Sequence, residues 1–176
     1  MKTRKITAAI AAVGVAALGA GVMAAAPASA ADRDTIDMLT FMVQEEKMAR
    51  DLYLEFAEEY GARQFTNIAR SEQKHMDAVR VLLDRYGIAD PTQGDAIGEF
   101  DNAQIQALYD ELRAKGLESL AKAAKVAITV EKGDIADIND MLEDKPAADV
   151  SLVLKNLKAG SYNHLAAFRM LRDRIS

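Results

Sequence analysis

Four long segments of the sequence carry apolar residues at intervals of three and four, which is the spacing of one face of an α-helix. The segments span residues 34–60, 63–86, 117–143 and 147–175. No run of useful length alternates in the strand pattern, and the chain contains only three prolines. Because helices of this length must bury their apolar faces against one another, the pattern predicts an all-α fold.

The lengths of the connections predict how these helices are joined. Only a few residues separate the first two segments, and the short stretch DKPAAD separates the last two, so each pair is expected to be antiparallel. Residues 87–116 join the second and third segments through an acidic loop and a short helix over 103–115, with Asp101 as its expected N-cap. Two hairpins joined by one long crossover is the connectivity of a ferritin-like four-helix bundle, here with a short extra helix in the crossover.

The N-terminal residues 1–30 have the pattern of a secretory signal peptide. Basic residues within 1–5 precede an Ala-, Gly- and Val-rich run over 6–26, and a small-x-small triplet ends at Ala30. Cleavage after Ala30 would release a domain of residues 31–176 to the outside of the cell or to the cell envelope. An uncleaved membrane anchor is the alternative, since the apolar run nearly reaches the length that spans a bilayer.

Charge and cysteine content exclude several kinds of partner and site. The chain has 27 acidic against 22 basic residues, and the expected signal peptide removes basic residues only. This acidic balance argues against nucleic acid and, after cleavage, against an anionic membrane as partners. The chain has no cysteine, so disulfides, thiolate sites and iron–sulfur clusters are excluded, and any metal must be held by oxygen and nitrogen ligands.

Each of the four apolar faces is interrupted near its middle by a residue that can bind a metal. These residues are Glu46 in the first segment, Glu72 and His75 in the second, Glu131 in the third and His164 in the fourth. Periodicity does not separate Glu46 from the neighbouring Glu45. A buried carboxylate is costly unless it is paired or bound to a metal, and residues three apart on a helix project to one side. The four helices are therefore expected to bring these groups to one shared metal site.

The charges of this set match divalent cations. Glu46, Glu72, Glu131 and Asp134 together would neutralise two such ions, and the two histidines of the chain would serve as neutral ligands. A set of carboxylates and imidazoles suits iron, manganese or zinc and does not choose among them. The alternative is a hydrogen-bonded Glu–His core pair without metal, with the remaining glutamates at the edge of the bundle.

Four motifs resemble those of the rubrerythrin branch of the ferritin-like superfamily: EKMARDLY, SEQKHMDAV, VEKGDI and GSYNHLAAF. The resemblance implies that Glu46 rather than Glu45 is a ligand, and that Asp134 stands where a further glutamate can occur. It also implies that Tyr53 donates a hydrogen bond to a ligand, although a core aromatic with a satisfied hydroxyl explains this tyrosine equally well. Ser161 replaces the usual glutamate of the fourth helix, so a second metal would be weakly held or absent unless Asp134 compensates.

A closer resemblance is to the domain-of-unknown-function family 2202. The blocks EEKMARDLY, IARSEQKHMDAVRVLLDRYG, LYDEL and GSYNHLAAF are similar to its signatures and cover nearly all of residues 31–176. This resemblance implies the fold, but the family has no settled activity.

The expected function is that of an exported bundle that binds one or two metal ions, with iron or manganese favoured and zinc as an alternative. Turnover would oxidise ferrous iron or reduce peroxide or dioxygen. Whether the chain is an enzyme stays open, and a peroxidase cycle would need an external electron donor because the cysteines of rubrerythrins are absent. Two alternatives are a non-catalytic metal-sequestering bundle and a helical interaction module without metal. The sequence gives no oligomeric state.

Overall fold

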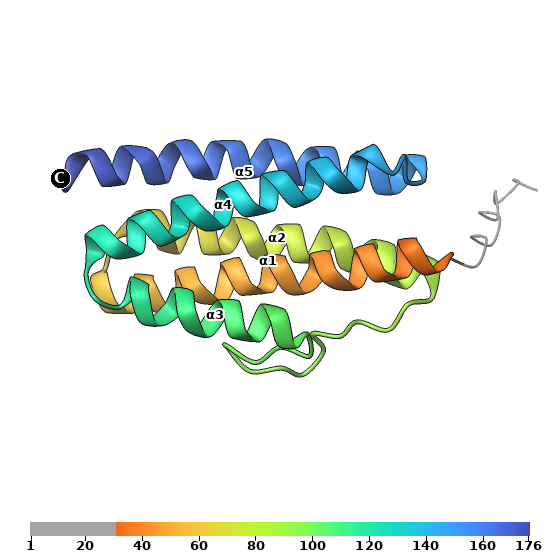
Figure 1. Ribbon diagram of the computed structural model, residues 1–176, viewed down its shortest axis with the longest axis horizontal. Coiled ribbons are helices and arrows are strands. Elements are labelled where there is room, and N and C mark those ends of the chain that lie inside the picture. Colours follow the sequence, from red (N-terminus) through yellow and green to blue (C-terminus); the bar gives the residue numbers. More distant parts are fainter. Residues whose placement is uncertain (1–30) are drawn as a thin grey trace, which may run out of the picture.

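The computed structural model describes residues 31–176, and this part of the chain is all-α, with five helices and no strand (Figure 1). The helices are α1 (Arg33–Tyr60), α2 (Arg63–Tyr86), α3 (Ala103–Gly116), α4 (Leu120–Glu143) and α5 (Ala148–Arg174). The all-α prediction is therefore confirmed. Among the described helices, none is both long and apolar enough to cross a membrane. The predicted signal peptide lies outside the described residues.

Glycines end the first two helices where the sequence predicts. Gly61 follows α1 with φ of 62°, and Gly87 follows α2 with φ of 66°. These left-handed conformations are accessible to glycine at little cost, so each helix stops and the chain can turn back. At the other end of α1, the carboxylate of Asp32 accepts a hydrogen bond from the backbone N–H of Thr35.

One N-cap and one helix start differ from the predictions. Asn102, not Asp101, caps α3, because its side chain accepts hydrogen bonds from two backbone N–H groups of the first turn. The helix α4 begins at Leu120 rather than at Leu117, because the hydroxyl of Ser119 caps it. The apolar pattern continues through the break between α3 and α4, and periodicity alone therefore placed this start too early.

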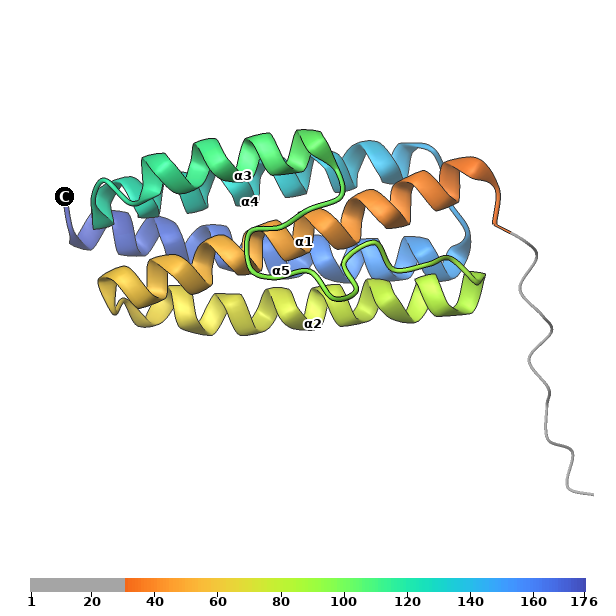
Figure 2. The same ribbon diagram turned by 90° about the horizontal axis from the view of Figure 1, so that it is seen from below.

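The four long helices form two hairpins, α1 with α2 and α4 with α5 (Figures 1 and 2). The α1/α2 hairpin contacts the other through α1 against α4 and α2 against α5, and α3 packs against α1 and α4. Figure 2 shows residues 87–102 running back along the bundle before α3 begins. The crossover thus covers the outer face of α1.

A buried ion pair on α1 fixes the path of the crossover. The ammonium group of Lys47 lies 2.7 Å from Asp51 Oδ2 and also donates to the carbonyls of Ala96 (2.8 Å) and Glu99 (2.9 Å). Asp51 accepts a further hydrogen bond from the backbone N–H of Gly98. We call Lys47 and Asp51 the crossover anchor. Both side chains are almost fully buried, so their charges are satisfied by each other and by the loop rather than by water, and the guanidinium of Arg50 also donates to Asp51 Oδ1.

Two apolar clusters fill the bundle, one toward each end. One contains aromatic residues such as Tyr53, Phe65 and Phe168, and the other is aliphatic and includes Leu39, Val79 and other side chains of α1, α2, α4 and α5. On α1, α2 and α5 the polar residues singled out in the sequence lie between the segments that supply these two clusters. On α4, Glu131 and Asp134 lie between Val130 and Ile135 of the aromatic cluster. The apolar packing therefore holds a polar layer across the middle of the bundle.

Candidate metal centre

The polar layer contains a metal-binding type of residue from each long helix. Glu46 comes from α1, Glu72 and His75 from α2, Glu131 from α4 and His164 from α5. The three carboxylates and His164 are buried, and the side chain of His75 is 12% exposed. All five residues predicted as ligands thus lie in one layer of the bundle.

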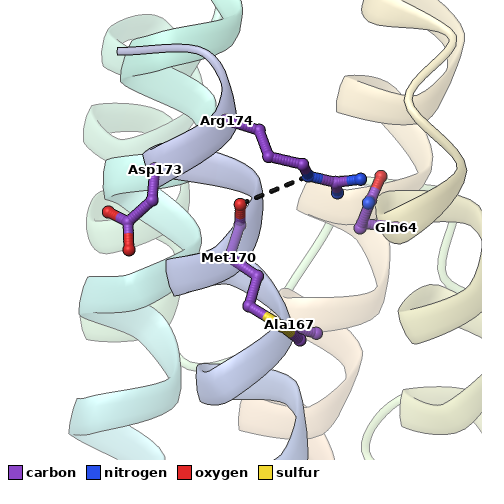
Figure 3. A pocket seen from close by; sticks show the side chains of 5 residues that line it. All are labelled: Gln64, Ala167, Met170, Asp173 and Arg174. Atoms are coloured by element: carbon purple, nitrogen blue, oxygen red, sulfur yellow. Dashed lines mark hydrogen bonds between the residues drawn. The ribbon is translucent and has the colours of Figure 1, made fainter.

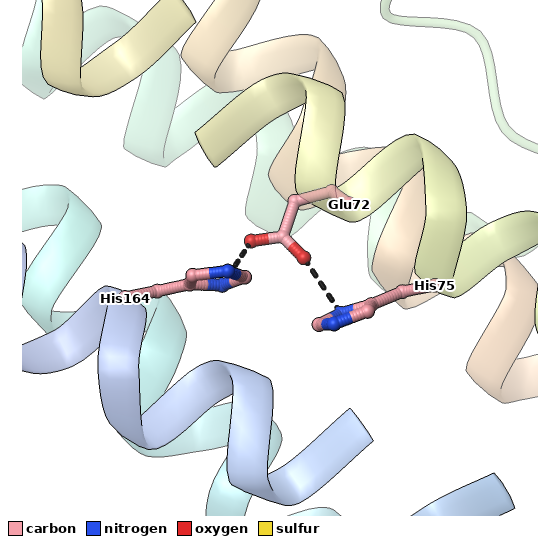
Figure 4. Close-up of side chains that lie close together, drawn as sticks. All are labelled: Glu72, His75 and His164. Carbon is pink, nitrogen blue, oxygen red and sulfur yellow. Dashed lines mark ion pairs between the residues drawn. The ribbon is translucent and has the colours of Figure 1, made fainter. Parts of the chain in front are cut away.

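Glu72 lies between the two imidazoles (Figure 4). Its Oε2 is 2.8 Å from Nδ1 of His75, and its Oε1 is 2.8 Å from Nδ1 of His164. The imidazole rings are stacked with centroids 5.3 Å apart, and one ligand atom from each of the three residues lies within 4.8 Å of the others. We call Glu72, His75 and His164 the triad.

Two further carboxylates extend the triad, one beside each imidazole. Glu46 Oε2 lies 3.1 Å from His75 Nδ1, and Glu131 Oε2 lies 3.6 Å from His164 Nδ1. The hydroxyl of Tyr53 donates a hydrogen bond of 2.8 Å to the other oxygen of Glu131. Tyr53 thus lies beside a candidate ligand, as the resemblance implied.

Several buried atoms of the site have no hydrogen-bond partner among the described residues. Glu72 Oε1 and His164 Nδ1 are close, but neither makes an aligned hydrogen bond, and Glu46 Oε1 has no partner either. Buried polar atoms are nearly always hydrogen-bonded, and unsatisfied ones mark sites that take an ion or a water. The donor set of oxygen and imidazole nitrogen is one that could hold a divalent transition metal.

The charges of the metal-free site follow from burial and from these short contacts. Burial alone would lower the pKa of His75, but contacts with Glu46 and Glu72 raise it to about 11. Contacts with Glu131 and Glu72 likewise raise the pKa of His164 to about 9, although burial opposes them. Burial tends to raise the pKa of Glu72, yet the two imidazoles lower it to about 2. Burial raises the pKa of Glu46 and of Glu131 to about 8. A cation entering the triad would therefore replace protons on both imidazoles.

Ser161 and Asp134 occupy the place where the sequence lacks a fourth-helix carboxylate. The hydroxyl of Ser161 donates to the carbonyl of Leu157 in its own helix, at 3.0 Å. Asp134 is buried, and both of its oxygens lack a hydrogen-bond partner among the described residues. Burial raises the pKa of Asp134 well above its usual range, against the lowering effect of nearby Ser161.

Two residues of the site, Ser71 and Gly160, were missed in the sequence, and Glu45 was set aside in favour of Glu46. Glu45 is buried and lines the same cavity as Glu46. The hydroxyl of Ser71 lies 2.9 Å from Nε2 of His164. The only indication of this contact in the sequence was that Ser71 directly precedes Glu72. A Cβ atom at Gly160 would lie 2.5 Å from Nε2 of His75, so this glycine makes room for the imidazole. A glycine in the middle of a long helix was the signal for that contact.

A small internal cavity lies beside the triad. Its lining residues are Glu45, Glu46, Ala49, Glu72, Val130, Glu131 and Asp134. The cavity offers a volume of about 10 Å³ to the centre of a water molecule, which is the space needed for a single water or ion. The cavity is lined mostly by carboxylates, so it favours a cation.

A larger groove lies on the surface, away from the triad (Figure 3). It has a volume of about 580 Å³ and is lined by Gln64, Ala167, Met170, Asp173 and Arg174. The Nε atom of Arg174 donates to the carbonyl of Met170 within the same helix. These residues do not form a set of ligating groups, so the chemistry of this chain is better sought in the polar layer.

A helical bundle with a buried layer of carboxylates and imidazoles is the class of protein that this fold and site define. The family model described as uncharacterized protein domain DUF2202 matches residues 35–174, and the chain belongs to this family. This confirms the family that the sequence blocks predicted.

One curated relative is uncharacterized protein MJ0754 of Methanocaldococcus jannaschii. It is 45% identical over 133 residues, which cover 75% of this chain and 72% of that protein. The crystal structure of hypothetical protein MJ0754 from Methanococcus jannaschii DSM 2661 resembles the present structure with a TM-score of 0.81 at 41% identity. That match covers 87% of this chain and 88% of the other chain.

Proposed function

We propose that this protein is a ferritin-like bundle whose core binds one or two divalent transition metals. The ferritin-like assignment is supported by two antiparallel helical hairpins joined by one long crossover. The metal assignment rests on one observation above all. Glu72 lies 2.8 Å from each of two imidazole nitrogens, and one of these contacts is not an aligned hydrogen bond.

The ligands in this proposal are the triad together with Glu46 and Glu131. Tyr53 holds Glu131 in place through its hydroxyl, and Ser71 contacts Nε2 of His164 so that Nδ1 is directed to Glu72. Bound iron or manganese would supply one-electron chemistry for the oxidation of ferrous iron or the reduction of peroxide or dioxygen. The reduction of peroxide in a catalytic cycle would draw its electrons from an external donor, because the chain has no cysteine for an iron–sulfur centre.

Export belongs to the same proposal. It is motivated by the basic, then apolar, then small-residue pattern of residues 1–30. N-terminal sequencing of the protein from its own cells tests it, with a first residue of Ala31 expected. An intact N-terminus in the membrane fraction would support an uncleaved anchor instead.

Metal analysis of the chain over residues 31–176 tests the metal assignment. Glu72→Gln removes the central carboxylate, and Glu58→Gln is the matched control because Glu58 is exposed on α1. We expect stoichiometric metal in the parent and in Glu58→Gln, and its loss in Glu72→Gln. A parent chain without metal after exposure to iron, manganese and zinc would overturn the proposal. Bound iron that is oxidised by peroxide would support turnover, and redox-silent zinc would support sequestration.

A further inference from the structure

The cavity beside the triad contains more unsatisfied oxygen atoms than one metal at the triad explains. Five buried carboxylate oxygens of residues that line this cavity have no hydrogen-bond partner among the described residues. Glu72 Oε1 belongs to the triad, and the other four are Glu45 Oε2, Glu46 Oε1, Asp134 Oδ1 and Asp134 Oδ2. Glu45 and Asp134 are each more than nine-tenths buried. Neither residue contacts the triad nitrogens within ion-pair distance.

Among the described residues, no lysine or arginine pairs with Glu45, Glu46 or Asp134, and of these three only Glu46 pairs with an imidazole, through its Oε2. None of the described residues that line the cavity is lysine or arginine. The nearest lysine in sequence is Lys47, and its ammonium group is committed to Asp51 and to two crossover carbonyls. Protonation would remove a charge and supply one O–H donor per carboxyl group, whereas one cation would be shared by all three groups.

We propose that Glu45 and Asp134, together with Glu46, form a second cation site on oxygen ligands alone, between α1 and α4. This inference rests on the proposed metal function, because Glu46 is shared with the triad. Its Oε2 lies 3.1 Å from His75 Nδ1, whereas its Oε1 is unpartnered, so one carboxylate serves both positions. Two adjacent glutamates of α1 thus supply the charge that Ser161 does not supply from α5.

The ligands define which cation fits. A site of carboxylate oxygens suits hard cations such as Mn²⁺, Fe²⁺ or Mg²⁺, whereas imidazole in the triad also suits Zn²⁺. Mg²⁺ usually keeps several waters, and a cavity of about 10 Å³ has no room for them. We therefore expect the second site to prefer Mn²⁺ or Fe²⁺ and zinc to bind at the triad.

Manganese and zinc stoichiometries of four chains test this site. The parent and the control Glu58→Gln are expected to bind two Mn²⁺ ions per chain, with the coupled electron paramagnetic resonance spectrum of two neighbouring ions. Glu45→Gln and Asp134→Asn are expected to bind one Mn²⁺, with the spectrum of an isolated ion. Both variants should still bind one Zn²⁺, which shows that the triad is intact and the chain folded.

The outcomes separate this site from the proposed function. If the parent binds a single Mn²⁺, or if both variants still bind two, the second site is overturned while the triad stands. If Glu45→Gln and Asp134→Asn lose zinc together with manganese, these residues support the triad and do not form a separate site. If the parent binds neither metal, the proposed function itself fails.

Discussion

His75 packs against the backbone of α5, and the residue opposite it is Gly160. A Cβ atom there would lie 2.5 Å from Nε2 and 2.7 Å from Cε1 of the imidazole. Gly160→Ala should therefore displace His75 and weaken zinc binding at the triad. Overpacking costs about 1–3 kcal/mol, and it opposes the gain of about 1 kcal/mol that alanine brings to a helix interior.

Gly133→Ala is the matched control for this prediction. Gly133 also lies inside a long helix, but a Cβ atom there would meet nothing within 4 Å. We expect it to stabilise the chain by about 1 kcal/mol and to leave zinc affinity unchanged. Urea unfolding and zinc titration measure both effects. Equal zinc affinity in the two variants would show that Gly160 does not position His75.

The stability of the metal-free chain should fall as the pH rises. The pKa of His75 is about 11 and that of His164 about 9 in the folded chain, above the ordinary value of 6.5. The pKa of Glu46 and of Glu131 is about 8, above the ordinary value of 4.5. At a pH between the ordinary pKa of a group and its pKa in the folded chain, the folded chain holds a proton that the unfolded chain has released. Each such proton lowers the free energy of unfolding by about 1.4 kcal/mol per pH unit.

Thermal unfolding in the presence of a chelator, at several pH values from neutral to alkaline, measures this dependence. We expect the midpoint to fall steadily over that range. Glu72 acts in the opposite sense, since its pKa of about 2 adds stability above pH 4.5 that is lost only as the pH falls through 2. Metal affinity should rise with pH, because binding releases the same protons. A midpoint that rises or stays level from neutral to alkaline pH would contradict the charges assigned to the site.

Sequence periodicity predicted the residues of the triad because a polar residue on an apolar face is visible without coordinates. Periodicity did not show which of Glu45 and Glu46 is the ligand. Other elements cover a broad face of α1, so both of these adjacent residues are buried. The contact of Gly160 with His75 depends on how two helices are placed across the bundle. Spacing within one helix carries no information on such a contact.

At the scale of the helix, the crossover anchor makes α1 a support for the loop as well as a source of ligands. Replacing Asp51 by alanine would leave the ammonium group of Lys47 buried without its carboxylate. Breaking a buried pair in this way costs about 3–5 kcal/mol. We expect this loss in urea unfolding, with faster hydrogen exchange in residues 96–102 because two carbonyls and one N–H group of the crossover depend on the anchor.

An exposed ion pair serves as the control for the Asp51 prediction. Near the start of α4, Nζ of Lys122 lies 3.5 Å from Oε2 of Glu118, and both side chains are exposed. Glu118→Ala should cost less than about 0.5 kcal/mol, and it should leave exchange in the crossover unchanged. Similar losses in the two variants would mean that the buried pair contributes no more than a surface pair.

The sequence predicts some of the helix ends and not others. Gly61 and Gly87 are unambiguous because a left-handed residue must follow each helix and glycine adopts that conformation readily. The cap Asn102 has a neighbour, Asp101, that could serve equally well, and Ser119 lies within an apolar pattern that continues past it. Only the direction in which the chain enters the helix decides which side chain reaches the free N–H groups.

At the scale of the whole molecule, connection lengths predicted the two hairpins and the position of the long crossover. The route of that crossover was not predicted. Its course along α1 is set by hydrogen bonds from Lys47 and to Asp51, and neither side chain stands out in a helical pattern rich in charge. Long-range polar contacts of this kind leave no periodic trace in a sequence.

The polar layer draws its ligands from both hairpins, with Glu46, Glu72 and His75 on one and Glu131 and His164 on the other. A cation held there would cross-link two halves of the chain that are otherwise joined through the long crossover and packed side chains. Closing such a loop removes conformational freedom from the unfolded state, as a disulfide does. In a chain without cysteine, the metal would take over that role, and its loss would first loosen the docking of one hairpin on the other.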